Sequence, residues 1–191
     1  MDQIRHTVRL YTAQTPLVRS ILDRDGVCFS REEYVARKYA ESGPIFLTAY
    51  RWFVREAAKL VPPPPGGEFP YWAFRDLYSV EGSGDDVLAL DVPVEEAVFF
   101  DLYDWNKIVQ LRFIGENEAA ERAFRRELRN RGLTENQVML TDFYPELKAE
   151  TLKSWQRLFR RHEAIRAGDL TGVGGVQAAL WQIKKAWIAR E

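Results

Sequence analysis

Polar side chains that could bind a ligand gather around one segment near the start of the chain. Residues 8–12 alternate strand-forming residue types, and Arg9, Thr12 and Gln14 lie in or just after this segment. An arginine in an otherwise buried strand needs an ionic partner or access to a cleft. Two alternatives follow: Arg9 forms a surface salt bridge, or its guanidinium and the Thr12 hydroxyl face a ligand and hold a phosphate or a ribose.

An aromatic run provides a second candidate surface. Residues 69–74 read Phe-Pro-Tyr-Trp-Ala-Phe, and strand alternation places Tyr71 and Trp72 on opposite faces. Apolar side chains on both faces indicate that both are buried, or that one face closes over a flat ligand. In the second case an aromatic ring would stack on an adenine or nicotinamide ring.

Two carboxylates, Asp101 and Asp104, directly follow the apolar run at residues 97–100. Loop positions after core strands often carry functional residues. The structural alternative is that Asp104 caps the next helix and Asp101 stabilises the turn. We favour the structural role for Asp104 and leave both roles open for Asp101.

The balance of charge differs between the two halves of the chain. Residues 102–191 carry 16 Lys and Arg against 12 Asp and Glu, whereas residues 1–101 carry 11 against 16. Two segments have arginines interleaved with glutamates: Arg122, Arg125, Arg126 and Arg129, and then Arg157, Arg160 and Arg161. This pattern is typical of solvated helices with i, i+4 ion pairs. Nucleic acid is therefore the less expected partner of these faces, although the pattern does not exclude it.

Strand and helix patterns alternate along the chain. Strands are expected near residues 8–12, 71–75, 87–92, 97–100 and 176–183. Helices are expected near residues 16–23, 30–41, 44–60, 116–131 and 145–162. Trp155 shares the apolar face of the last helix and is expected to be a core anchor. These elements predict an α+β fold, one domain over residues 1–191, with a small mixed sheet surrounded by helices.

Composition excludes several classes of protein. The formal net charge is -1, which gives no general attraction to nucleic acid or anionic membranes. No segment approaches the roughly 20 apolar residues of a membrane helix. The single cysteine, Cys28, allows no internal disulfide and fits a reducing compartment, so we expect a cytoplasmic protein. His6 and His162 show no ligand spacing, so we expect no metal site.

Several segments together resemble an uncharacterised bacterial family of unknown function. They are residues 8–14, 49–52, the Pro-Pro-Pro-Gly loop followed by residues 71–73, and residues 101–105 and 177–184. The resemblance covers nearly the whole chain, and it implies no established activity.

More distantly, the chain resembles the ADP-ribosyltransferase fold. Those domains open with a strand that bears Arg or His, and a later strand supplies an aromatic or hydroxyl group. The resemblance assigns these two roles to Arg9 and Tyr71, and it implies NAD or a related nucleotide as the ligand. Thr12, Gln14 and Trp72 would then help to bind the nucleotide.

The late strand of that fold supplies a catalytic glutamate, and here the chain differs. Residues 176–183 contain no acid, and Gln182 stands where the glutamate would be expected. A neutral amide cannot act as a base as a carboxylate does. Asp101 is then the first candidate for the missing acid, and Gln177 on the same strand is a candidate nucleotide-binding residue.

Two functions from different classes remain open. The first is a nucleotide- or NAD-binding domain of ADP-ribosyltransferase-like build, with or without transfer activity. The second is a non-catalytic interaction module that binds protein or nucleic acid through its aromatic loop or its arginine-rich helices. The sequence does not specify an oligomeric state.

Overall fold

The computed structural model describes residues 6–31, 43–80 and 86–189. Its main sheet has five strands in the spatial order β4 (Asp86–Pro93), β1 (Thr7–Gln14), β3 (Tyr71–Phe74), β6 (Val176–Leu180) and β5 (Ala97–Asp101). The α+β class and the small sheet are confirmed. The sheet was expected to be mixed, and each neighbouring pair of its strands is antiparallel. The helix expected at residues 30–41 lies almost entirely outside the described residues.

The segment expected to be one last strand, residues 176–183, forms two strands in different sheets. After β6 the chain bends at Trp181, whose indole Nε1 donates to the Val61 carbonyl at 2.6 Å. β7 (Gln182–Lys184) then pairs with β2 (Val27–Phe29) in a separate two-stranded sheet. Trp181 packs in the same hydrophobic cluster as Phe100, whereas Ile183 packs in the cluster of Leu10 and Leu90. The chain therefore bends between these two residues.

Helices connect the strands. They are α1 (Pro16–Asp25), α3 (Gly43–Ala57), α4 (Leu102–Val109), α5 (Glu118–Asn130), α6 (Glu135–Leu140), α7 (Pro145–Trp155) and α8 (His162–Arg166). Short 3₁₀ turns are η1 (Leu77–Ser79), η2 (Val94–Glu96), η3 (Gln156–Phe159) and η4 (Lys185–Trp187). The helix expected over residues 145–162 is therefore divided into α7, η3 and α8.

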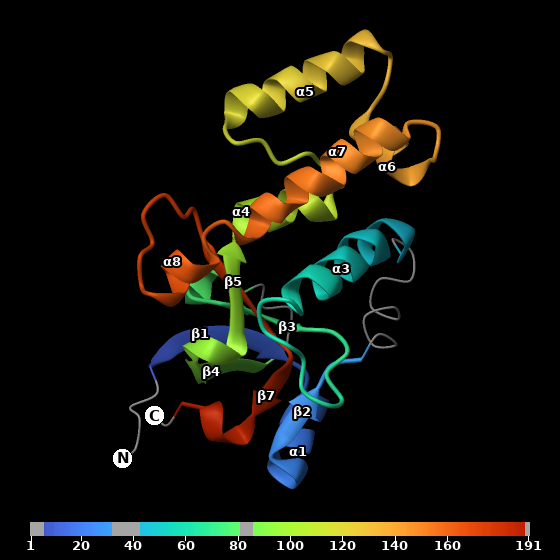
Figure 1. Ribbon diagram of the computed structural model, residues 1–191. Helices are drawn as coiled ribbons and strands as arrows, with labels where there is room; N and C mark the ends of the chain where they lie inside the picture. Colours follow the sequence, from blue (N-terminus) through green and yellow to red (C-terminus); the bar gives the residue numbers. More distant parts are fainter. Residues whose placement is uncertain (1–5, 32–42, 81–85, 190–191) are drawn as a thin grey trace.

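Each face of the sheet is covered by its own hydrophobic cluster. The first cluster joins sheet residues such as Phe100 and Ala179 to α3, α4 and Trp155. The second joins Leu10, Leu90 and other sheet residues to α1, α8 and β7. Figure 1 shows α3, α4 and α7 above strands β1 and β4 in the view, with β7 below them. The sheet is therefore the middle layer of the fold.

A third, smaller cluster stabilises a group of helices apart from the sheet. Its buried residues are Phe124, Leu128, Val138 and Leu147. Phe113 stacks on Phe124 with ring centroids 4.4 Å apart. We call α5, α6 and the first three residues of α7, residues 118–147, the helical arm. In Figure 1 the arm lies at the opposite end of the molecule from β1, β4 and β7.

Trp155 joins the arm to the core of the sheet. It is fully buried, so its expected role as a core anchor is confirmed. Its ring meets Trp52 of α3 edge-on at a centroid distance of 5.3 Å. Its Nε1 donates to the Arg112 carbonyl at 2.7 Å, which fixes the segment that leads into the arm.

Candidate functional site

Arg9 is paired across the sheet. Its register partner on β4 is Asp91, and two hydrogen bonds join the side chains, Nε to Oδ1 at 2.7 Å and Nη2 to Oδ2 at 3.1 Å. Both side chains are almost half exposed, at 49% and 43%. The hydrogen bond to Asp91 raises the pKa of the Arg9 guanidinium above its ordinary value. This is the geometry of a surface salt bridge.

Thr12, Gln14 and Trp72 come together between β1 and β3. Thr12 is fully buried, and its Oγ1 donates to the Trp72 carbonyl at 2.7 Å. The Gln14 side-chain amide donates to the same Thr12 oxygen at 2.8 Å. The Thr12 hydroxyl therefore has both a donor and an acceptor within the protein.

Tyr71 and Trp72 lie on opposite faces of β3, as strand alternation predicts. Trp72 packs into the first core cluster, and its Nε1 donates to the Tyr50 hydroxyl at 2.8 Å. Tyr71 packs against the second cluster, and its hydroxyl lies 3.1 Å from the Cys28 Sγ. A single flat ligand on one face of the sheet can therefore meet only one of these two rings.

Gln177 carries an unpartnered polar atom. The residue is 3% exposed, and its Oε1 has no hydrogen-bond partner among the described residues. The register places Gln177 opposite Phe74 on one side and Phe100 on the other. It therefore lies on the same sheet face as Trp72, the face that α3 and α4 cover.

The other two candidate catalytic residues have separate partners. Asp101, and not Asp104, is the N-cap of α4: its Oδ1 accepts from the Tyr103 amide at 2.8 Å and its Oδ2 from the Gly174 amide at 2.7 Å. The expected cap was one turn too late because β5 extends to Asp101 and α4 begins directly after it. Gln182 donates to Glu96 at 2.9 Å.

Asp104 has a different role from the expected cap. It is buried in α4, and its carboxylate forms ion pairs with Lys107 at 3.3 Å and Arg160 at 3.0 Å. Arg160 comes from one of the two arginine-rich runs. That run therefore serves in part to compensate a buried charge.

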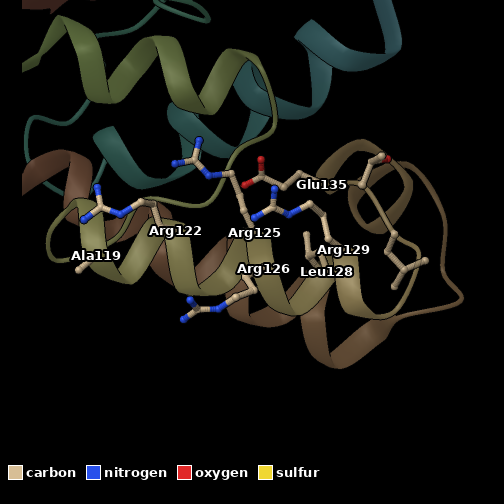
Figure 2. A pocket seen from close by; sticks show the side chains of 9 residues that line it. Ala119, Arg122, Arg125, Arg126, Leu128, Arg129 and Glu135 are labelled. Atoms are coloured by element: carbon tan, nitrogen blue, oxygen red, sulfur yellow. The ribbon is translucent and has the colours of Figure 1, made fainter.

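A hollow lined mainly by charged residues lies on the helical arm. It has a volume of about 760 Å³ and is lined by Ala119, Arg122, Arg125, Arg126, Leu128, Arg129, Leu133, Thr134 and Glu135. We call it the arginine groove. Figure 2 shows its arginines projecting from successive turns of α5, with the carboxylate of Glu135 among the side chains that line it.

Local sequence explains why α5 presents its arginines in this way. Asn117 caps the helix by accepting from the Ala120 amide at 3.0 Å. Phe124 and Leu128, at i and i+4, bury one face against the rest of the arm, so the arginines occupy the remaining faces. Gly132 then adopts a left-handed φ of 69°, which an L side chain would strain.

The other wall of the groove begins after this turn. Thr134 starts α6 with a capping box: its Oγ1 accepts from the Gln137 amide at 3.3 Å, and the Gln137 side chain accepts from the Thr134 amide at 2.9 Å. The turn and the cap together fold residues 133–135 back beside α5. A pattern of arginine and glutamate along α5 alone could not indicate this wall, although Gly132 and the Thr134-x-x-Gln137 spacing are signals for it.

The arginines of the groove differ in whether they have an ionic partner. Arg122 forms an exposed pair with Glu118 at 3.1 Å. Within residues 6–31, 43–80 and 86–189, the side chains of Arg125, Arg126 and Arg129 form neither a hydrogen bond nor a direct ion pair, although the charge of Arg125 acts on Glu135 at longer range. Guanidinium groups that are free in this way are available to an anion from outside the molecule.

Glu135 is the acidic residue of the groove. Burial raises its pKa, and the nearby positive charges of Arg112 and Arg125 and a hydrogen bond from the Phe113 amide act in the opposite direction. That amide lies 2.9 Å from its Oε1. One oxygen of Glu135 is therefore held by the backbone, and its carboxylate lies near enough to Arg125 to interact with that charge.

The family model for Domain of unknown function (DUF3841) matches residues 9–189. The chain belongs to this family. The DUF3841 match extends from β1, where Arg9 lies, to the segment after η4, and it includes the whole helical arm. No curated protein and no solved structure matches the chain. The family description gives no activity.

Two further observations concern the described part of this DUF3841 chain. None of its helices has both the length and the apolar character needed to cross a membrane. Within residues 6–31, 43–80 and 86–189, no three His, Cys, Asp or Glu side chains form a group that could hold a metal ion.

Proposed function

We propose that this protein is a non-catalytic interaction module that binds nucleic acid in the arginine groove. The observation that carries the proposal is the set of three arginines, Arg125, Arg126 and Arg129, that line a groove of about 760 Å³. None of the three has an ionic partner among the described residues. Guanidinium groups bind phosphate oxygens through paired, charge-assisted hydrogen bonds.

The position of the charges supports a polyanion as the partner. Residues 125, 126 and 129 are spaced i, i+1 and i+4, so they span about one turn of α5, or roughly 6 Å along its axis. Several groups at this spacing can meet more than one phosphate along a backbone. The excess of Lys and Arg in residues 102–191 adds a favourable field around the same region.

The test is fluorescence anisotropy of labelled 20-nucleotide RNA and DNA across a series of salt concentrations. We expect binding that weakens as salt rises, because phosphate contacts release counterions. Replacing Arg125, Arg126 and Arg129 together with Gln should lower the slope of log affinity against log salt by about two, since each contact to a single strand contributes about 0.7.

Arg131 provides a matched control on the same helix end. It is paired with Glu127 at 2.6 Å and does not line the groove. Arg131→Gln should leave both the affinity and the salt slope almost unchanged. Absence of binding to any nucleic acid at 50 mM salt, or an unaltered slope in the triple variant, would refute the proposal.

A second candidate function is supported by Gln177. We propose, as the alternative, a NAD or nucleotide site of ADP-ribosyltransferase-like build on the sheet face that Gln177 and Trp72 share. Its support is the buried Oε1 of Gln177, which lacks a partner in the described residues and could accept from a ligand. Arg9 would have to leave Asp91 to take part, and Tyr71 lies on the other face.

Calorimetry with NAD, ADP-ribose and ATP at millimolar concentration tests this alternative. If it is right, Arg9→Ala should keep the fold and weaken binding by about tenfold or more, the effect of losing a hydrogen bond to a charged group. Gln177→Leu should weaken binding as well. If none of the three ligands binds at millimolar concentration, the alternative fails and the interaction module remains.

A further inference from the structure

An exposed aromatic ring lies on the loop that joins α6 to α7. Phe143 is 83% exposed, and Leu140 at the end of α6 is 47% exposed. The neighbouring ring of Tyr144 packs against the small cluster of the arm, whereas Phe143 belongs to no cluster. An exposed phenylalanine in an otherwise polar loop contributes little to stability, and it is available for contact with a partner.

The loop holds Phe143 in a defined position. Before it, the Thr141 hydroxyl donates to the Gln137 carbonyl at 2.7 Å. Lys148 Nζ, from α7, donates to the Thr141 carbonyl at 3.3 Å and to the Asp142 carboxylate at 2.9 Å. After it, Pro145 begins α7. The backbone on both sides of the ring is therefore tied to a helix, so little ordering is needed when a partner binds.

One short helix separates this ring from the arginine groove. Thr134 lines the groove and caps α6, and Phe143 lies just beyond the other end of that helix. The six residues of α6 span about 9 Å at 1.5 Å per residue, and two more residues lie between α6 and Phe143. A single strand of a few nucleotides is long enough to bridge a separation of this order. Phosphates in the groove and a base on Phe143 could therefore belong to the same short strand.

We infer that the partner is single-stranded nucleic acid, with its backbone in the arginine groove and one base stacked on Phe143. This inference rests on the proposed function and names its substrate class. Single-strand binders combine a positive groove with aromatic side chains on which bases stack. In an intact duplex the base faces are covered by their neighbours, so the ring would have no such role.

An acidic protein segment is the competing occupant, because guanidinium groups pair with carboxylates as well as with phosphates. The ring of Phe143 favours nucleic acid, because it belongs to none of the three hydrophobic clusters and follows the polar residues Thr141 and Asp142 in the loop. Protein interfaces depend on aromatic anchors in well-packed pockets, whereas base stacking needs only one accessible ring face.

The experiment compares a labelled 12-nucleotide single strand with a duplex of the same sequence by anisotropy, using the full chain. Phe143→Ala should weaken single-strand binding by about tenfold, the loss of one stacked base, and should change duplex binding by less than twofold. Phe143→Trp should retain or increase single-strand affinity. Tyr78→Ala is the matched control, because Tyr78 is 86% exposed but lies outside the arm.

The outcomes separate this inference from the proposed function. If Phe143→Ala binds the single strand like the wild type while the triple arginine variant does not bind, the groove remains a nucleic-acid site and the stacking role is refuted. An equal preference for duplex and single strand in the wild type also refutes it. An acidic 12-residue peptide that displaces the oligonucleotide at lower concentration than unlabelled single strand would replace it with the protein partner.

Discussion

Two groups of surface arginines in this protein have opposite surroundings. Arg9 on β1 lies beside Asp91, and two hydrogen bonds of 2.7 and 3.1 Å join the pair. On the helical arm, Arg125, Arg126 and Arg129 line a groove and have no ionic partner among the described residues. Arg9 is therefore already neutralised within the protein, and the arm retains unneutralised positive charge.

Whether an arginine has an ionic partner depends on which acidic residues its secondary-structure element brings close to it. The partner of Arg9 is 82 residues away in sequence and becomes its neighbour only through the β1–β4 register. On α5, the glutamates at 118 and 127 pair with Arg122 and Arg131 at i, i+4, so they do not reach the other three arginines. The same residue type is structural in one place and available in the other because of the geometry of its element.

The arm and the sheet should unfold as one cooperative structure, and replacing Trp155 tests this. Trp155→Ala should lower the free energy of unfolding by about 3–5 kcal/mol, because a fully buried indole and its bond to the Arg112 carbonyl are both lost. The measurement is chemical denaturation followed by circular dichroism. Trp155→Phe, which keeps most of the ring, should lose clearly less.

Two results would break this part of the comparison. A loss below about 1 kcal/mol for Trp155→Ala would mean that the indole is not an anchor. Two separate unfolding transitions in the wild type would mean that the arm holds its shape without the sheet, so the groove would not depend on the core.

The sheet side contains a buried histidine whose titration should change stability. His162 on α8 accepts a hydrogen bond at Nδ1 from the Phe99 amide at 3.0 Å. Burial lowers the pKa of His162 below the ordinary 6.5. The negative charge of the nearby Glu163 raises this pKa, whereas the positive charge of Arg166 lowers it further. As the pH falls below 6.5, the unfolded chain therefore binds a proton that the folded chain does not.

Stability should consequently fall with the pH below 6.5, by up to about 1.4 kcal/mol per pH unit until the folded-state pKa is reached. Above 6.5 the residue is neutral in both states and contributes no pH dependence. Denaturation at pH 7.5 and pH 5.5 measures the difference, and His162→Asn, which keeps an acceptor but does not titrate, is the control. Equal pH dependence in the two proteins would show that another group is responsible.

On the arm, the capping box of α6 supports one wall of the groove. Thr134→Ala should cost about 1 kcal/mol, because the amide of Gln137 loses its acceptor. Thr134→Ser keeps the hydroxyl and should stay close to the wild type. Thermal denaturation gives the stability, and the anisotropy assay shows whether a loosened wall also reduces nucleic-acid affinity. Equal losses for Ala and Ser would assign the effect to the methyl group instead of the cap.

Much of the fold could be predicted from residue patterns. The five strands of the main sheet, α1, α3 and α5 agree with alternation, apolar periodicity and caps such as Asn117. The split of residues 176–183 could not be predicted, because the bend depends on Trp181 finding the Val61 carbonyl 120 residues away. The cap at Asp101 was likewise displaced because the end of β5 is set by its pairing with β6.

The candidate site was harder to predict for the same reason. Arg9, Thr12 and Gln14 stood out as polar residues in a strand, but their partners lie on β4 and β3. The arginines of α5 resembled an ordinary solvated face until the turn at Gly132 brought residues 133–135 beside them. Local patterns indicate which residues are polar; long-range pairing decides which of them remain free.

The smallest expected effect concerns the Arg9–Asp91 pair itself. Arg9→Ala, Asp91→Ala and the double variant form a double-mutant cycle, and we expect a coupling that is barely measurable and disappears at 1 M salt. Both side chains are almost half exposed, so water and ions screen the attraction. The same variants should bind oligonucleotides within about twofold of the wild type, because an exposed pair on the sheet makes no phosphate contact of its own. A strong, salt-insensitive coupling would mean instead that the pair is shielded from solvent, as it would be inside a ligand cleft. That result would remove the contrast between Arg9 and the arm, and it would favour the nucleotide site on the sheet over the groove on α5.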